Sequence, residues 1–383
     1  MGPGRPRLLV TRVDAADVPQ WHIADPADPA QPPRTVRYPA AGTANHEVTL
    51  WIAALDGSRT QVRWDIDALE YLPGAGWDAH GRYAVVQSRD QRTVRFLRID
   101  QATSKTFILN EQWDHCWVQL IPGLPARSGD GALIAHADRH GTRHLTVDGV
   151  PVTPPGLQLR AVLGVDGDEI LFTASDDPAE THLWTYRPAD GLRRLTSEPG
   201  VHHGTRRAGT LVHTARCAGQ PGGRTTVVRP HQPPVPIGSR AERPVLDLHA
   251  TPLVLGPREL RAVLYLPSWH RPGQGSLPVL ANQVTAVREA ARLHPELDLG
   301  RVGIRGWSFG GSLAALAVLR RPDVFPASTL RLSSALLAAG RPHEVLLLAG
   351  VGHHAIGTPV TEHLLQHQVR FLQRHLGAVP GDL

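Results

Sequence analysis

One serine of this chain stands in a pattern that could make it a nucleophile. It is Ser308, in the motif Gly306-x-Ser308-x-Gly310. This spacing is typical of a tight turn between a strand and a helix that raises the serine hydroxyl clear of the sheet. The glycines Gly306 and Gly310 would keep side chains out of crowded positions. The N–H of Phe309, at the start of the predicted helix, would stabilise negative charge that develops at the serine during acyl transfer.

A serine nucleophile needs a base that accepts its proton. His353 is our candidate and His354 the reserve, because both follow the apolar run 345–350 and precede a predicted last helix. In α/β-hydrolases the catalytic histidine comes after the serine and the acid in the chain. The alternative, two loop histidines in a chain with 21 histidines, stays open.

The acid that would orient this histidine is not found in the expected place. Between Ser308 and His353 the only carboxylates are Asp323 and Glu344. The end of the helix after the motif explains Asp323, and Glu344 enters the apolar run. The segment 326–340 predicts a turn and a second helix, so both the strand and the loop that would carry an acid are missing.

The elements around the motif predict an α/β domain. Strands are expected at 260–267, 277–280, 301–305 and 345–350, and helices at 283–293, 329–337 and 361–376, besides the helix after the motif. The inner face of the helix at 283–293 is expected to carry Val284, Val287, Ala291 and Leu293. The last helix should face a sheet with Leu365, Val369, Leu372 and Leu376.

From the N-terminus to about residue 240 the chain is rich in β-forming residues, with no convincing long helix. Hairpins with Asp-centred turns recur at Asp56, Asp100, Asp148 and Asp190, at intervals of 44, 48 and 42 residues by subtraction. A loose period of roughly 40–50 residues is typical of propeller blades, whereas a β-sandwich has turns at shorter spacing. The intervals accommodate four or five blades, so the ring is expected to be open or partial.

A proline-rich segment at about 230–244 predicts a linker between the two parts. We therefore predict a partial β-propeller over residues 1–240, followed by an α/β-hydrolase domain that lacks some strands over residues 241–383.

The composition argues against several classes of function. No window approaches the roughly 18 apolar residues of a membrane span, and the N-terminus has no apolar signal core. The net charge of +5 comes from arginines spread along the chain, without the basic stripe of a nucleic-acid binder. Cys116 and Cys217 match no metal spacing and are expected to be buried thiols. The histidine pairs at 202–203 and 353–354 lack a further ligand at a suitable spacing. We expect a cytoplasmic protein with no metal, cofactor, nucleic-acid or membrane partner.

A longer form of the motif resembles a known family. The run Gly-Trp-Ser-Phe-Gly-Gly at 306–311 is similar to the elbow of the prolyl oligopeptidase family, in particular its dipeptidyl-peptidase IV-like branch. The segments 264–267 and 340–345 resemble the same catalytic domain, and the upstream strands resemble its propeller. The resemblance implies that Ser308 is the nucleophile, His353 the general base and the Phe309 N–H an oxyanion donor.

Three features of that branch have no counterpart in this sequence. Its Tyr-Gly-Gly loop would follow Leu280, and its aspartate loop would precede Ser328. The adjacent glutamates that hold the substrate's free amine are also missing, since the chain contains no Glu-Glu pair. The sequence therefore resembles a shortened copy with internal losses, in which Met1 falls inside the propeller.

Three functional hypotheses follow. The first is a serine peptidase that hydrolyses short peptides through a Ser-His acyl-enzyme mechanism, impaired by the missing triad aspartate, with a homodimer left open as its assembly. The second is a catalytically inactive family member whose propeller is an interaction module. The third is a carboxylesterase, because the motif alone does not distinguish ester from amide; the propeller argues against it.

Overall fold

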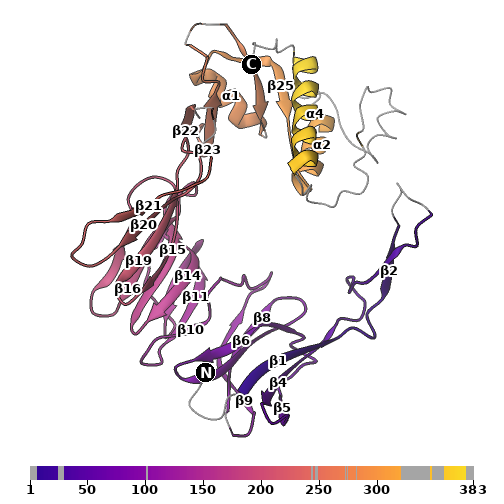
Figure 1. Ribbon diagram of the computed structural model, residues 1–383, viewed down its shortest axis with the longest axis vertical. Helices are drawn as coiled ribbons and strands as arrows, with labels where there is room; N and C mark the ends of the chain where they lie inside the picture. Colours follow the sequence, from indigo (N-terminus) through magenta and orange to yellow (C-terminus); the bar gives the residue numbers. More distant parts are fainter. Residues whose placement is uncertain are drawn as a thin grey trace. The chain divides into compact units, whose positions relative to one another are not determined.

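The computed structural model describes residues 7–24, 30–100, 102–242, 245, 249–271, 273, 275–281, 283–320, 346 and 358–376. The chain divides into two compact units, Met1–His22 with Thr35–Arg243 and Ile23–Arg34 with Pro244–Leu383. Figure 1 shows that the described helices all belong to the second unit. The domain limits 1–240 and 241–383 stay a prediction.

Apart from one small two-stranded sheet, the described part of the first unit consists of five successive antiparallel sheets. The first sheet has three strands: β1 (Arg7–Asp14), β4 (Glu47–Ala54) and β5 (Arg59–Val62). Between β1 and β4, the strands β2 (Gln20–Ile23) and β3 (Arg34–Arg37) form a small sheet of their own.

The other four sheets have four strands each, in chain order. Their strands are β6 (Tyr71–Asp78), β7 (Gly81–Gln87), β8 (Thr93–Ile99) and β9 (Thr106–Trp113); β10 (Ala126–Arg127), β11 (Leu133–Arg139), β12 (Thr142–Val147) and β13 (Val150–Pro151); β14 (Gln158–Asp166), β15 (Glu169–Ser175), β16 (His182–Arg187) and β17 (Gly191–Arg194); and β18 (Val201–Arg207), β19 (Thr210–Arg216), β20 (Arg224–Val228) and β21 (Val235–Ile237). These sheets are the blades of the predicted partial β-propeller.

The Asp-centred turns recur at equivalent places, as predicted. Each joins the last two strands of its sheet, and the four residues are Asp56, Asp100, Asp148 and Asp190. The Asp56 carboxylate accepts hydrogen bonds from the Ser58 hydroxyl at 2.6 Å and from the Ser58 N–H at 2.9 Å. Both bonds lower the pKa of the Asp56 carboxyl, the hydroxyl more than the N–H. Because this turn chemistry is local, the repeat is visible in the sequence.

The predicted linker at 230–244 is partly wrong. Its residues Val235–Ile237 form β21, the fourth strand of the last sheet, and pair with β20. Within it, Pro236 lies opposite Thr226. A proline is tolerated there because β21 is an edge strand, whose outer side needs no ladder hydrogen bond.

Consecutive sheets pack against each other through apolar side chains. Ile134 and Leu145 share one buried cluster with Leu159, Ile170 and Phe172, which come from the next sheet along the chain. Each of these side chains contributes about 1.5–3 kcal/mol through removal of apolar surface from water. Burial between sheets therefore stabilises the first unit.

A buried ion pair joins the second sheet to the third. The Arg127 guanidinium donates two hydrogen bonds to the Asp78 carboxylate, at 2.7 and 2.6 Å. Only 7% of the Arg127 side chain is exposed, so this charge depends on its partner.

The described part of the second unit has the predicted α/β pattern. β22 (His249–Leu255) and β23 (Leu260–Leu266) form an antiparallel ribbon. β24 (Leu277–Ala281) and β25 (Leu297–Ile304) are parallel, and α1 (Val284–Leu293) connects them. The two pairs of strands are separate sheets.

Two further helices belong to this α/β-hydrolase domain. α2 (Phe309–Arg320) follows β25, and α4 (Thr358–Leu376) comes near the end of the chain. The predicted helix at 329–337 lies outside the described residues, and so does the predicted strand at 345–350 apart from Leu346.

The predicted inner face of α1 is right in part. Val287 is buried and Val284 and Ala291 are partly buried, but Leu293 is 61% exposed. The second fully buried position is Ala290. With 3.6 residues per turn, Leu293 lies about 120° around the helix from Val287 and on the opposite side from Val284.

The predicted face of α4 is also right in part. Leu372 and Leu376 pack on β25 at Gly303, where a Cβ would come within 3.3 and 3.5 Å of the two leucines. Leu365 and Val369 are 53% and 44% exposed. Only the C-terminal half of α4 therefore packs on β25 as predicted.

Within the described parts of the chain, none of the helices combines the length and apolar character that a membrane-spanning segment needs.

Candidate active site

The nucleophile motif has the predicted form of strand, turn and helix. β25 ends at Ile304 and α2 begins at Phe309, which leaves a turn of four residues that ends in Ser308. Ser308 has a φ of 54°, in the left-handed region that a residue with a Cβ rarely adopts. Its carbonyl oxygen accepts a hydrogen bond from the Gly311 N–H at 2.9 Å. The serine is therefore strained in the way expected of a nucleophile elbow.

Gly306 makes this turn sterically possible. A Cβ at Gly306 would lie 2.0 Å from the Gly310 carbonyl oxygen and 2.6 Å from the Gly311 nitrogen. These are backbone atoms, so no side chain can move aside, and the prediction for this glycine is confirmed. The same prediction for Gly310 is wrong, because a Cβ there would meet nothing within 4 Å.

The residues around the serine are open to solvent. Ser308 is exposed, and its neighbours Trp307 and Phe309 are 49% and 75% exposed. Phe309 is the first residue of α2, so its N–H belongs to the helix terminus, where backbone donors have no partner within the helix. Its role as oxyanion donor stays a prediction.

The predicted base lies outside the described residues. His353 and the reserve His354 both fall in the segment 347–357, and the two carboxylates considered above, Asp323 and Glu344, fall in 321–345. The pairing of Ser308 with His353 therefore stays a prediction.

Arg301 fixes β25 relative to the elements beside it. Its guanidinium donates to the Asp298 carboxylate at 2.7 Å, to the Ser276 carbonyl oxygen at 3.0 Å and to the Leu376 carbonyl oxygen at 3.4 Å. The bond from Arg301, followed by that from the Gly300 N–H, lowers the pKa of the Asp298 carboxyl. These contacts hold the strand that leads to the serine.

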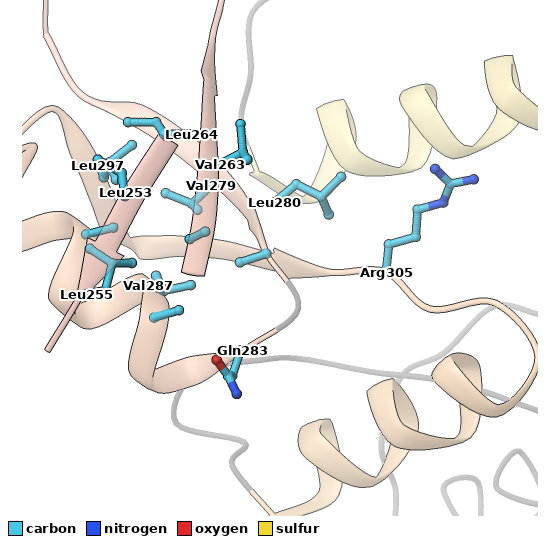
Figure 2. A pocket seen from close by; sticks show the side chains of 14 residues that line it. Leu253, Leu255, Val263, Leu264, Val279, Leu280, Gln283, Val287, Leu297 and Arg305 are labelled. Carbon is cyan, nitrogen blue, oxygen red and sulfur yellow. The ribbon is translucent and has the colours of Figure 1, made fainter. Parts of the chain in front are cut away.

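An apolar pocket of about 310 Å³ lies in the same unit. Figure 2 shows aliphatic side chains from β22, β23, β24 and α1 around it. Its polar lining residues are Gln283, just before α1, and Arg305, the first residue of the turn that carries Ser308. The sequence did not reveal this pocket, because its walls are separate apolar runs whose spacing depends on the tertiary fold.

One group of potential metal ligands occurs among the described residues. Asp114, His115 and Cys116 have ligand atoms within 4.8 Å of one another. His115 and Cys116 are exposed and Asp114 is partly so, and the Asp114 carboxylate already accepts the Cys116 N–H at 2.7 Å. We assign no metal to this loop. Cys116 is exposed and Cys217 half-buried, so the prediction of two buried thiols is wrong.

Two family models match the chain. The model of the dipeptidyl peptidase IV N-terminal region matches residues 3–206, and the model of the prolyl oligopeptidase family matches residues 268–329, which include Ser308. The chain belongs to the prolyl oligopeptidase family, in its dipeptidyl peptidase IV-like branch. The resemblance predicted from the elbow motif is thus confirmed.

The similar proteins match very different shares of this chain. Dipeptidyl peptidase 8 from Mus musculus and from Homo sapiens are each 43% identical to it over 44 residues, which is 12% of this chain and 5% of each relative. Its fold is similar to the crystal structure of Porphyromonas gingivalis dipeptidyl peptidase 4, with a TM-score of 0.77 at 15% identity. That match covers 97% of this chain and 73% of the other.

Proposed function

We propose that this chain is a serine peptidase that cleaves short peptides, with Ser308 as its nucleophile. The observation that carries the proposal is the left-handed backbone of Ser308 between β25 and α2, in a chain of this family. A strained serine at this place in the fold has a cost in stability and an evident use in acyl transfer.

In the proposed reaction, the Ser308 oxygen attacks the carbonyl carbon of the scissile peptide bond while His353 accepts the hydroxyl proton. The resulting oxyanion takes a hydrogen bond from the Phe309 N–H. His353 then gives the proton to the leaving amine, the C–N bond breaks, and the acyl group stays on the serine. Water, deprotonated by His353, releases the acid and restores the serine.

The rate of peptide hydrolysis that we expect is low, because the sequence analysis finds no aspartate in the place of the triad acid. Where a triad acid is removed from a serine protease, the rate constant falls by roughly 10⁴, because the histidine is no longer held in the correct tautomer. We therefore propose a slow peptidase. If the chain proves not to be a peptidase, the two alternatives are a catalytically inactive interaction module and a carboxylesterase.

The test is labelling of the full chain with a fluorophosphonate, which reacts with activated serines. Wild-type protein should be labelled at Ser308, found by peptide mapping, while Ser308→Ala and heat-unfolded wild type should not. His353→Ala should slow the labelling, and His354→Ala should leave it unchanged. No labelling of folded protein would favour the inactive module, and turnover of short-chain esters without dipeptide amides would favour the esterase.

A further inference from the structure

The pocket in the second unit has the form of a slot between two strand edges. Three consecutive residues of β23 line it (262–264), and so do three consecutive residues of β24 (279–281). Since successive side chains of a strand point to opposite faces, a strand lines a cavity with consecutive residues only when it presents its edge. β22, in contrast, contributes the alternate residues Leu253 and Leu255 from one face.

Both edges are unpaired among the described strands. β23 is hydrogen-bonded to β22 alone, and β24 to β25 alone. Each therefore has a row of backbone N–H and C=O groups without a ladder partner, which is the feature that recruits an additional strand.

A helix forms the floor of the slot. The lining residues at its base are Gln283, Ala286, Val287 and Ala290, which follow the spacing of one helical face. Ala290 packs with Leu255 of β22, and Val287 packs with Val302 of β25, so α1 reaches both sheets. Apart from Gln283, the floor is apolar, and it extends from one sheet to the other.

The two ends of the slot differ in charge. At one end, Leu297 pairs with Leu277 at the start of the parallel strands. At the other end, beyond Ala281 and Ile304, lies Arg305, the only charged residue among the described residues that line the pocket. Figure 2 shows its guanidinium turned away from the aliphatic side chains, beyond Leu280. Arg305 has no hydrogen bond or ion pair within the part of the chain that the structure describes.

We propose that this slot binds an extended, apolar peptide segment that ends in a free carboxylate. The segment would run parallel to β24, which brings its C-terminus to the end where β24 and β25 finish and where Arg305 lies. Its backbone would pair with the free edges of β23 and β24, its side chains would cover α1, and its carboxylate would accept hydrogen bonds from the guanidinium. The proposal does not depend on peptidase activity.

The test is fluorescence anisotropy with a labelled probe and the full chain carrying Ser308→Ala, which prevents cleavage. The probe has an N-terminal fluorophore, a soluble glycine-serine spacer and five valine or isoleucine residues, to match the five residues of β24. A second probe ends in a carboxamide. A third has N-methylated amides, which keep the apolar surface but remove the N–H donors.

The acid probe should bind with a dissociation constant about threefold to tenfold lower than the amide probe, the range of a partly exposed guanidinium–carboxylate pair. Arg305→Gln should abolish that difference, whereas Arg292→Gln, an exposed arginine of α1 outside the pocket, should keep it. The N-methylated probe should bind at least about tenfold more weakly, because the strand pairing is lost. Ala286→Phe, which fills the floor, should weaken all probes.

Four results would overturn the inference. The acid probe fails to bind the folded chain, the N-methylated probe binds equally well, or Arg305→Gln leaves the preference for the acid unchanged. In the fourth, sedimentation shows a dimer that excludes the probe, which would give the slot to a second copy of the chain. Loss of labelling at Ser308 with intact probe binding would reject the peptidase and leave this inference standing.

Discussion

Replacement of Ser308 by glycine or alanine gives a test of the strained elbow that does not depend on activity. In the left-handed region an L-residue is disfavoured by about 1–2 kcal/mol. Alanine keeps this penalty, and glycine removes it at a cost of about 0.5–1 kcal/mol in backbone entropy. Ser308→Gly should therefore be about 0.5–1 kcal/mol more stable than Ser308→Ala.

The sign of this difference is the informative quantity, because glycine is less stable than alanine in ordinary backbone. Ala314→Gly in α2 is the matched control and should lose about 1 kcal/mol. Urea unfolding followed by the helical signal at 222 nm measures both, because all described helices lie in the second unit. In the control, glycine is expected to be less stable than alanine. If Ser308→Gly also proves less stable than Ser308→Ala, Ser308 does not have a left-handed backbone and the assignment of a nucleophile elbow is wrong.

Three further predictions follow from the described contacts. Gly306→Ala should unfold the second unit or destabilise it by more than about 4 kcal/mol, because the added Cβ would overlap backbone atoms. Gly310→Ala should be neutral or stabilising by up to about 1 kcal/mol, and urea unfolding measures both variants. Asp78→Ala should cost the first unit about 3–5 kcal/mol, because it leaves the Arg127 charge buried and unpaired. Urea unfolding followed by tryptophan fluorescence measures this loss, since most of the tryptophans lie in the first unit, and a loss below about 1 kcal/mol would contradict the burial. Burial, then the neighbouring histidine on β18, lowers the pKa of His213, so the unfolded state binds more protons once the pH drops below about 6.5. The free energy of unfolding should therefore fall as the pH is lowered through that value, and His213→Gln should flatten the slope.

The propeller could be predicted because its strongest signal is local. The Asp56 and Asp100 carboxylates accept hydrogen bonds from residues two or three positions away, so the sequence shows these turns directly, whereas the Asp148 carboxylate accepts the Leu133 N–H from β11. The first strand of a sheet can be harder to predict. β6 reads Tyr-Leu-Pro-Gly-Ala-Gly-Trp-Asp, without the alternation of apolar and polar residues that marks a half-buried strand.

The second unit likewise has one feature that the sequence predicts, the elbow, and one that it does not, the slot. The elbow is made from a strand, a turn and a helix that are contiguous in sequence, so the motif at 306–311 was enough to predict it. The slot between β23 and β24 was not predictable, because it depends on which strands fail to pair, and no pattern of residues records that. Leu293 and Leu365 were expected on buried helix faces but are exposed. The periodicity of a helix shows that one face is apolar, but it does not show which residues at the margin of that face are buried.

The contiguity of the elbow also decides how a failed labelling experiment should be interpreted. Its strain arises from Ser308, Gly306 and the start of α2, all within six residues of the chain, whereas the predicted base, His353, lies more than forty residues further on. The elbow can therefore form in a chain whose triad is incomplete. If Ser308→Gly is stabilising and the wild-type serine nevertheless does not react with a fluorophosphonate, the defect lies in the base or its acid rather than in the nucleophile. In that case the strain is retained without the catalysis it serves, and relieving it should carry no loss of function.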